Sequence, residues 1–355
     1  MNYKLDKIPN RTKKTRDIGL TMVMDKGLSV REAEDLVYSS SDYIDIIKLG
    51  FGTAIISKNI KKKIQLYQKN NIKVHVGGTL FEAFIIRNMF DDYIKFVEEL
   101  NLNTIEVSDG SIDLNHKIKC DYISDLSKKF TVFSEVGYKK SNRILAPSKW
   151  IKLMKQELDA GSWKVIAEAR ESGTVGVFRK DGEIRSDLIE EILSKIPNEK
   201  ILWEAPKKDQ QVWFIKLMGA NVNLGNIDPK SVIPLECLRL GLRGDTFHQF
   251  IKWIIMREID IDNFLKLNRN NIQVIDIREK YEFDDGCISK LNIPMDQILD
   301  SIHLIDKINP VVIYCNSGRR GAAVVHILRK KYSMNNVSNL SGGYQSYLEK
   351  IKAVK

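Results

Sequence analysis

At 355 residues the chain is too long for one ordinary compact domain, and it predicts two or three. Hydrophobic residues make up 43% and charged residues 29%, a balance typical of a globular protein with a buried core. The net charge is +10, but the lysines are scattered and form no basic stripe with interleaved aromatics, which argues against a nucleic-acid partner. No run reaches the ~20 apolar residues that cross a bilayer, and no secretory signal is visible. We therefore expect a cytoplasmic protein with no membrane partner.

Short apolar runs rich in valine and isoleucine predict a series of strands, at residues 19–24, 44–49, 73–76, 104–107, 130–136, 164–169, 201–203 and 221–224. Amphipathic stretches between them predict helices, at residues 29–38, 55–70, 81–100, 148–160, 186–196 and 208–218. This alternation predicts an α/β fold, either a (β/α)8 barrel or a doubly wound open sheet. Charged residues end nearly every strand, which favours the barrel, because barrels build their active sites there.

A second, smaller α/β pattern follows the predicted barrel. Strand-like runs at 258–261, 274–277, 311–314 and 337–340 surround a predicted helix at 322–331. We expect a parallel sheet of its own for this part. The predicted domains are therefore a barrel at residues 1–256 and a small α/β domain at 257–355, joined by a helix at 247–256.

Carboxylates gather at the predicted strand ends of the first domain, together with cationic side chains. The carboxylates are Asp25, Glu106, Asp109, Glu135, Glu168 and Glu204, and the accompanying residues are Lys48, His75, Lys139, Arg170 and Arg243. Converging carboxylates repel one another unless cations intervene, and Mg²⁺ prefers hard oxygen ligands. Glycine-containing segments around Gly225-Asn226 and Arg243-Gly244 are expected to follow the eighth strand, where barrels often bind phosphate. The pattern predicts an Mg²⁺ site that binds an anion, against the alternative that each carboxylate is a cap or an ion-pair partner.

The first domain resembles the phosphosulfolactate synthase family over residues 15–250. The matching motifs are GLTMVMDKG (19–27), GGTLFE (77–82), EVSDG (106–110), SEVG (134–137), AEARESG (167–173), WEAP (203–206), VNLGNI (222–227) and LGLRGDT (240–246). The resemblance implies an Mg²⁺-dependent barrel that adds sulfite to phosphoenolpyruvate to give phosphosulfolactate. It also implies a homo-oligomer.

The chemistry implied by the resemblance assigns roles to these residues. Sulfite attack on the methylene carbon pushes charge into the substrate carboxylate, which a metal would stabilise, and a lysine then protonates C2. We expect Lys139 as the general acid and Glu106, Glu135 and Glu168 as metal ligands. The residues expected to hold the substrate are Lys48, His75, Arg170, Gly225, Asn226, Arg243 and Gly244. One departure is Tyr138, which stands where the family is expected to have the first of two lysines.

A cysteine loop distinguishes the second domain. The predicted strand 311–314 runs into Cys315-Asn316-Ser317-Gly318-Arg319-Arg320 and then into a helix. A cysteine at a helix N-terminus lies among free backbone N–H groups and near the positive end of a dipole, which favour a thiolate and would cradle an anionic persulfide. The alternative is an inert buried cysteine beside a turn. The other cysteines, Cys120, Cys237 and Cys287, match no zinc or disulfide spacing.

This loop, together with VIDIRE (274–279) and LSGGY (340–344), resembles rhodanese domains over residues 257–350. The resemblance implies a sulfurtransferase in which Cys315 carries a persulfide and Asn316, Ser317, Gly318, Arg319 and Arg320 bind the donor. A six-residue loop suits sulfur substrates in this superfamily. The family often has a cation at the second loop position, so Asn316 weakens the expectation of thiosulfate as donor.

Together the two resemblances predict a fused enzyme that forms a carbon–sulfur bond in the barrel and handles sulfur in its tail. The tail would supply sulfite when it takes the outer sulfur of thiosulfate. Two alternatives stay open at this point. The barrel could be a non-synthase, stress-related protein carrying a sulfur-carrier or redox module, or it could act on another phosphorylated acid.

Overall fold

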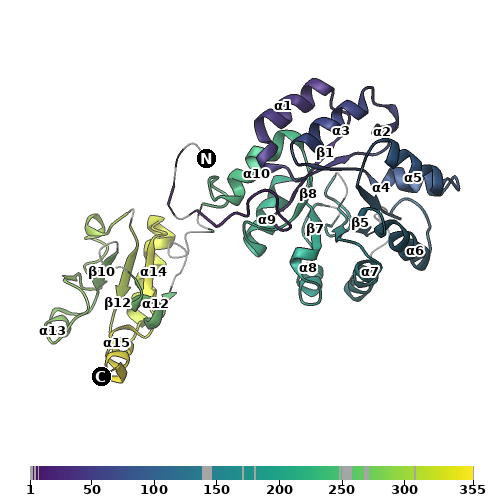
Figure 1. Ribbon diagram of the computed structural model, residues 1–355. Helices are drawn as coiled ribbons and strands as arrows, with labels where there is room; N and C mark the ends of the chain where they lie inside the picture. The colour runs from purple at the N-terminus through teal and green to yellow at the C-terminus, as the bar shows by residue number, and fades with distance from the viewer. Residues whose placement is uncertain are drawn as a thin grey trace. The chain divides into compact units, whose positions relative to one another are not determined.

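The computed structural model of the protein describes residues 3, 5–6, 8–137, 146–169, 172–179, 181–247, 249, 258–267, 272–307 and 309–354. The chain divides into two compact units, one formed by Ile8–Thr246 and the other holding Phe247–Lys355 (Figure 1). Each unit has its own parallel sheet. Among the described residues, no helix combines the length and the apolar character that crossing a bilayer requires.

The first unit is the predicted (β/α)8 barrel. Its parallel strands are β1 (Thr21–Asp25), β2 (Ile46–Leu49), β3 (Lys73–Val76), β4 (Thr104–Val107), β5 (Thr131–Val136), β6 (Lys164–Ala167), β7 (Ile201–Glu204) and β8 (Leu224–Ile227). Hydrogen bonds link them in the order β3-β2-β1-β8-β7-β6-β5-β4, and β3 packs against β4. All strands run in one direction, so their carboxyl ends meet at one mouth.

Helices cover the outside of these strands (Figure 1). They are α1 (Val30–Ser40), α2 (Thr53–Ile56), α3 (Ile60–Lys69), α4 (Gly78–Ile85), α5 (Phe90–Glu99), α6 (His116–Ser127), α7 (Pro147–Asp159), α8 (Ser186–Leu193), α9 (Lys208–Met218) and α10 (Val232–Arg239). Two predicted long helices are each split in two. Asn59 and Asn88 adopt positive φ angles of 58° and 56° at the breaks, a left-handed conformation that asparagine tolerates. The sequence pattern also missed α6 and α10, and the predicted joining helix at 247–256 falls almost entirely outside the described residues.

The barrel interior is built in layers because alternate residues of a strand point inward. One inward layer is apolar and contains Met22, Ile46, Phe133, Ile166 and Leu202, which pack in one buried cluster. The residues two positions further along four of these strands are Lys48, Glu135, Glu168 and Glu204, and all are buried. The same alternation that fills the core therefore places charged side chains in the next layer, toward the mouth.

The second unit is a small α/β domain, as predicted. Its strands are β9 (Glu258–Ile259), β10 (Gln273–Asp276), β11 (Leu291–Asn292), β12 (Val311–Tyr314) and β13 (Val337–Leu340), all parallel in the order β11-β10-β12-β13-β9. Its helices are α12 (Ile261–Leu265), α13 (Lys280–Asp284), α14 (Arg319–Tyr332) and α15 (Gly343–Val354). Apolar clusters cover both sheet faces, so its strands are buried on both sides.

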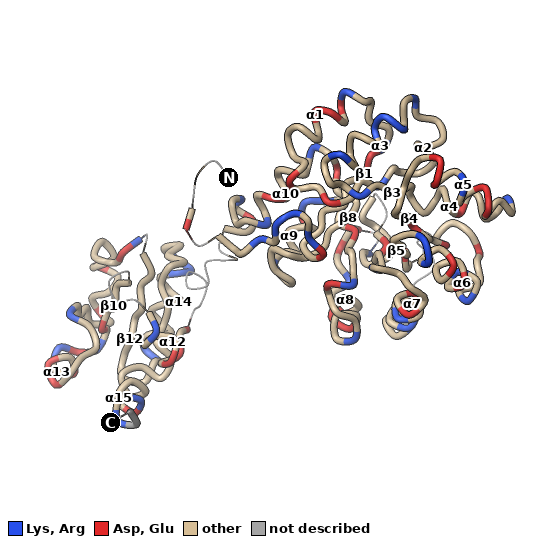
Figure 2. The backbone as a smooth tube through the Cα atoms, in the orientation of Figure 1, with Lys and Arg blue, Asp and Glu red and all other residues tan. Residues whose placement is uncertain are grey.

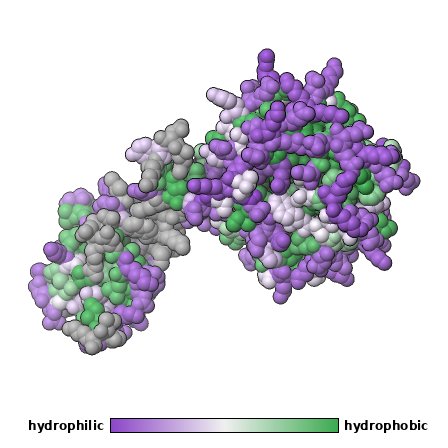
Figure 3. Space-filling model, in the orientation of Figure 1, coloured by the Kyte–Doolittle hydropathy of each residue, from purple (hydrophilic) through white to green (hydrophobic). Residues whose placement is uncertain are grey.

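Charged side chains are spread over the surface of both units. Segments of Lys and Arg and segments of Asp and Glu both occur along the barrel helices (Figure 2), and hydrophilic residues dominate the face of the barrel that Figure 3 draws.

Candidate active sites

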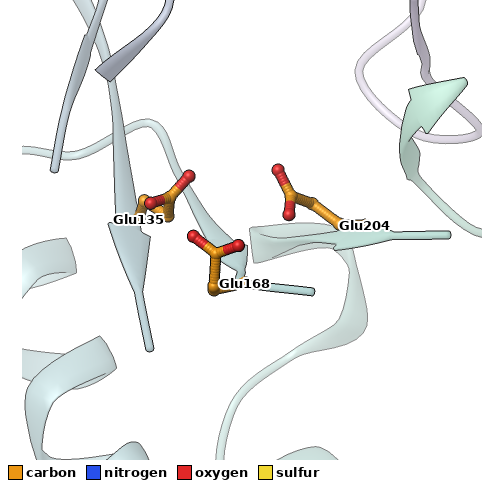
Figure 4. A group of neighbouring side chains, drawn as sticks. All are labelled: Glu135, Glu168 and Glu204. Carbon is orange, nitrogen blue, oxygen red and sulfur yellow. The ribbon is translucent and has the colours of Figure 1, made fainter. Parts of the chain in front are cut away.

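Three buried glutamates meet at the carboxyl ends of neighbouring barrel strands. Glu135 lies in β5, Glu168 directly follows β6, and Glu204 ends β7. Oxygen atoms from all three lie within 4.8 Å of one another (Figure 4). The loop that returns over Glu168 needs glycine at residue 176, because φ is +65° there and an added Cβ would lie 1.8 Å from the Glu168 carbonyl oxygen.

Lys48 supplies a cation inside this group of carboxylates. Its Nζ lies 2.9 Å from Glu106 Oε1, 3.5 Å from Glu135 Oε2 and 3.5 Å from Glu204 Oε1. The structure thus places Lys48 among carboxylates, although the sequence suggested a position holding substrate phosphate, carboxylate or sulfite. Its side chain links the three-glutamate group to Glu106.

Glu106 is held apart from the other three glutamates. Its Oε1 accepts a hydrogen bond of 2.7 Å from the backbone N–H of Gly78, the first residue of α4, in addition to the Lys48 contact. A helix N-terminus and an ammonium group both favour a carboxylate. Of the expected ligands, Glu135 and Glu168 lie in the three-glutamate group together with Glu204, whereas Glu106 lies outside it.

Burial and neighbouring charges shift the pKa values of this site. Burial raises the pKa of Glu204 to about 7, against the opposing attraction of Lys48, and the nearby Glu135 raises it further. Burial alone would lower the pKa of Lys48, but Glu106, Glu204 and Glu135 outweigh it and hold that pKa well above its ordinary value. The lysine therefore stays charged near neutral pH.

The donor set fits a hard divalent cation. Three buried carboxylates offer oxygen ligands, and the described residues supply Lys48 as the cation that contacts Glu135 and Glu204. Buried carboxylates that lie this close together repel one another, and a divalent cation between them would offset that repulsion. Oxygen ligands of this kind suit Mg²⁺. Glu135, Glu168 and Glu204 are the residues that would hold it.

His75 lies beside Glu106, and Asn226 lies in β8. His75 is fully buried, stacks on Phe133 at 5.5 Å, and lies with Nδ1 3.6 Å from Glu106 Oε2. Burial lowers its pKa, so the imidazole is neutral near pH 7. Asn226 has a φ of 56°, and its buried Oδ1 accepts no hydrogen bond from the described residues. That oxygen is an available polar contact at the end of β8.

The other expected substrate residues that the structure describes lie in and after β8, and Gly225 pairs in register with Glu204 of β7. Gly225 lies within β8, where an added Cβ would meet Leu202 at 2.3 Å, so close packing already accounts for this glycine. Arg243 and Gly244 follow α10, whose last residue Arg239 donates to the carbonyls of Leu20, Ala220 and Val222. Those carbonyls precede β1 and β8, so the segment starts from the opposite end of the strands. Lys139 and Arg170 lie outside the described residues.

Two further strand-end carboxylates have structural partners. Asp25 receives hydrogen bonds of 2.7 Å from Lys63 Nζ and 3.0 Å from Tyr67 Oη. Asp109 receives one of 2.8 Å from Lys119 Nζ, which also donates to the carbonyl of Glu135. Both fit the alternative of ion-pair partners, and Lys119 helps to fix the end of β5.

Cys315 lies at the end of β12, at the base of the loop that leads into α14. Its side chain is almost fully buried, and the N–H of Gly321 points at Sγ over 3.5 Å. Backbone N–H groups of Tyr344 and Gln345 donate to the carbonyls of Cys315 and Asn316, at 2.8 and 3.0 Å. The first turn of α15 therefore holds the loop, so that the Cys315 sulfur stays at the N-terminus of α14.

The last loop residue, Arg320, is paired with a residue that the sequence analysis missed. Its two terminal nitrogens donate to the two oxygens of Glu282 in α13, both at 2.9 Å. This contact lowers the pKa of Glu282. Only the fold could reveal the pair, because the two residues lie 38 positions apart.

Comparisons with known proteins agree with this description. The family model for (2R)-phospho-3-sulfolactate synthase matches residues 9–245, and that for the rhodanese-like domain matches residues 264–350. The chain belongs to the phosphosulfolactate synthase family. This family membership and the rhodanese-like domain identify an enzyme and confirm both resemblances drawn from the motifs.

Three curated relatives of the barrel are phosphosulfolactate synthases, and a more distant one, 23% identical over 65% of this chain and 88% of that protein, is Protein HEAT-STRESS-ASSOCIATED 32 of Arabidopsis thaliana. The chain is 40% identical to phosphosulfolactate synthase of Methanothermobacter thermautotrophicus over 67% of this chain and 95% of that protein. It is 42% identical to the synthase of Methanocaldococcus jannaschii over 64% of this chain and 94% of that protein. The second unit is similar to a putative mitochondrial thiosulfate sulfurtransferase of Schizosaccharomyces pombe, 32% identical over 22% of this chain and 66% of that protein. A non-synthase barrel is not favoured by these similarities.

Proposed function

We propose that the barrel catalyses the Mg²⁺-dependent addition of sulfite to phosphoenolpyruvate, giving phosphosulfolactate. Family membership supports the reaction class. The observation that carries the proposal is the convergence of Glu135, Glu168 and Glu204 beside Lys48. Such a site can hold a cation where a substrate carboxylate gains negative charge.

Different residues are assigned to different parts of this reaction. Sulfite forms a bond to the methylene carbon of phosphoenolpyruvate, the carbon–carbon π electrons move toward the substrate carboxylate, and C2 then takes a proton. The bound metal would supply electrostatic stabilisation of that carboxylate. Glu135, Glu168 and Glu204 would hold the metal, and Lys48 keeps Glu135 and Glu204 close while balancing part of their charge. Asn226 Oδ1 offers a further polar contact.

Removal of divalent cations tests this proposal directly. The full chain, exhaustively treated with EDTA and passed into metal-free buffer, is expected to lose sulfite addition to phosphoenolpyruvate. Added Mg²⁺ should restore it, because the carboxylates alone repel the anionic substrate. Phosphosulfolactate formation is followed by phosphorus NMR. Full turnover without a divalent cation would refute the metal assignment.

Lys139 remains the sequence-based prediction for the proton donor at C2. It follows β5, which carries Glu135, by three residues. The substitution Lys139→Ala is expected to lower turnover by ~10²–10⁴-fold, the usual contribution of general acid catalysis, and to leave the circular dichroism spectrum unchanged. Lys140→Ala is the matched control. If the control variant loses activity and Lys139→Ala does not, the role belongs to Lys140.

The second unit is proposed to be a sulfurtransferase whose persulfide forms on Cys315. The thiolate attacks the outer sulfur of thiosulfate and forms a new S–S bond. The S–S bond of the donor breaks, and sulfite leaves with the electron pair. Helix α14 and the loop N–H groups, including that of Gly321, favour the anionic sulfur.

Sulfite is the nucleophile of the proposed barrel reaction, so this step would supply it. The two units share one chain, and a tether can raise an effective concentration to the millimolar range when geometry permits. The units match the family models for (2R)-phospho-3-sulfolactate synthase and for the rhodanese-like domain, and the reactions proposed for them both handle sulfur. This shared chemistry supports the proposed coupling.

A further inference from the structure

The charge of the cysteine loop is lower than its sequence suggests. The loop from Cys315 to Arg320 contains two arginines, and its second position is the uncharged Asn316. Arg320 is engaged by both oxygens of Glu282, each at 2.9 Å. Such a two-pronged contact is the strongest geometry available to an arginine and a carboxylate. The exposed Arg319 is the other loop cation.

Glu282 has a second contact, at the start of its own helix. Its Oε2 accepts a hydrogen bond of 3.0 Å from the backbone N–H of Glu279, which completes a capping box at the start of α13. The side chain of Glu282 is 18% exposed, and that of Arg320 is 34% exposed. The pair is therefore ordered before any donor arrives, and it is partly shielded from solvent.

We propose that Glu282 is a specificity-determining residue that weakens the hold of the loop on dianionic sulfur donors. The inference rests on the proposed sulfurtransferase activity at Cys315. Thiosulfate carries two negative charges, whereas an alkyl hydropersulfide carries one, at the sulfur that is attacked. A negative charge next to Arg320 raises the free energy of the bound dianion more than that of the monoanion.

This arrangement has a consequence for sulfite supply. A raised KM for thiosulfate leaves the site unsaturated over a wide range of concentration. The rate of sulfite release then follows the thiosulfate concentration instead of reaching a plateau. The chemical step is not impaired, because Arg320 keeps its interaction with Cys315 while it pairs with Glu282.

The test compares two donors with full-length Glu282→Gln. Glutamine also serves in a capping box, so α13 should remain folded while the negative charge is lost. We expect the KM for thiosulfate to fall by about threefold to tenfold, the scale of a partly exposed ion pair, with kcat unchanged. The KM for a small alkyl hydropersulfide should change less than twofold. For both donors, the assay measures the sulfide released when a dithiol acceptor reduces the persulfide. The uncatalysed rate is subtracted.

Two further variants separate the proposal from its alternatives. Asp284→Asn removes one negative charge from the same helix, where the carboxylate pairs with Lys280 at 2.9 Å, and it should leave both KM values unchanged. In the double variant Glu282→Gln/Arg320→Gln the KM for thiosulfate should return to the wild-type value, because the unpaired arginine causes its fall in the single variant. An unchanged or increased thiosulfate KM in Glu282→Gln overturns the proposal. Failure of the wild type with both donors would instead contradict the sulfurtransferase activity.

Discussion

Glu168→Gln should lower the rate of sulfite addition by about 10²–10³-fold, the scale of losing one electrostatic contact in a preorganised site. Glu168 shares the group of close oxygen atoms with Glu135 and Glu204. Glutamine has the same shape but carries no charge, so the barrel should fold while metal affinity falls by at least about tenfold. Steady-state product formation and calorimetric titration with Mn²⁺ measure the two effects separately.

Asp109→Asn is the matched control for this prediction. Asp109 also follows a barrel strand, but it pairs with Lys119 at 2.8 Å and does not belong to the three-glutamate group. Its loss should lower the melting temperature and leave Mn²⁺ affinity within about twofold of the wild type. Equal losses of Mn²⁺ affinity in the two variants would show that the three glutamates hold no metal.

Cys315→Ser should abolish thiosulfate-dependent phosphosulfolactate formation, by at least about 10³-fold, because serine cannot carry a persulfide. The assay supplies the full chain with thiosulfate, a thiol acceptor, phosphoenolpyruvate and Mg²⁺, without sulfite. Added sulfite should restore the wild-type rate, since the barrel does not contain Cys315. This pattern would connect the two proposed reactions through one intermediate.

Cys287→Ser controls for the loss of a thiol from the same unit. Cys287 is exposed, whereas Cys315 is buried at the start of α14, so only the second has the helix N-terminus and the N–H of Gly321 at its sulfur. The control should behave as the wild type in both assays. Equal rates on thiosulfate for the wild type and Cys315→Ser would disprove the supply of sulfite by Cys315.

Strand periodicity explains why so much of the barrel site was readable from the sequence. Ile46, Phe133, Ile166 and Leu202 are inward-facing core residues, and Lys48, Glu135, Glu168 and Glu204 follow each by two positions. The alternation of side chains across a strand is a local property. The same alternation could have identified Glu204 as a site residue, because Glu204 lies two positions after the inward-facing Leu202.

Tertiary structure decided which of the charged residues act together. Glu106 and Glu204 both contact Lys48 and accept a backbone N–H, from Gly78 and Ala169 respectively, yet Glu204 belongs to the three-glutamate group and Glu106 does not. The partners of Glu106 come from β2 and α4, and no local pattern reveals that they converge on one oxygen. The same holds for Asp25, which is paired with Lys63 from α3.

The barrel, the small α/β domain, the cysteine loop and the family of each unit could all be predicted from the sequence. Repeated strand and helix patterns and long ordered motifs encode these features locally. Only the tertiary structure grouped Glu204 with Glu135 and Glu168, placed Gly225 inside β8 and joined Arg320 to Glu282. Those outcomes depend on contacts between distant segments, because a carboxylate becomes a ligand or an ion-pair partner according to which charge the fold places beside it.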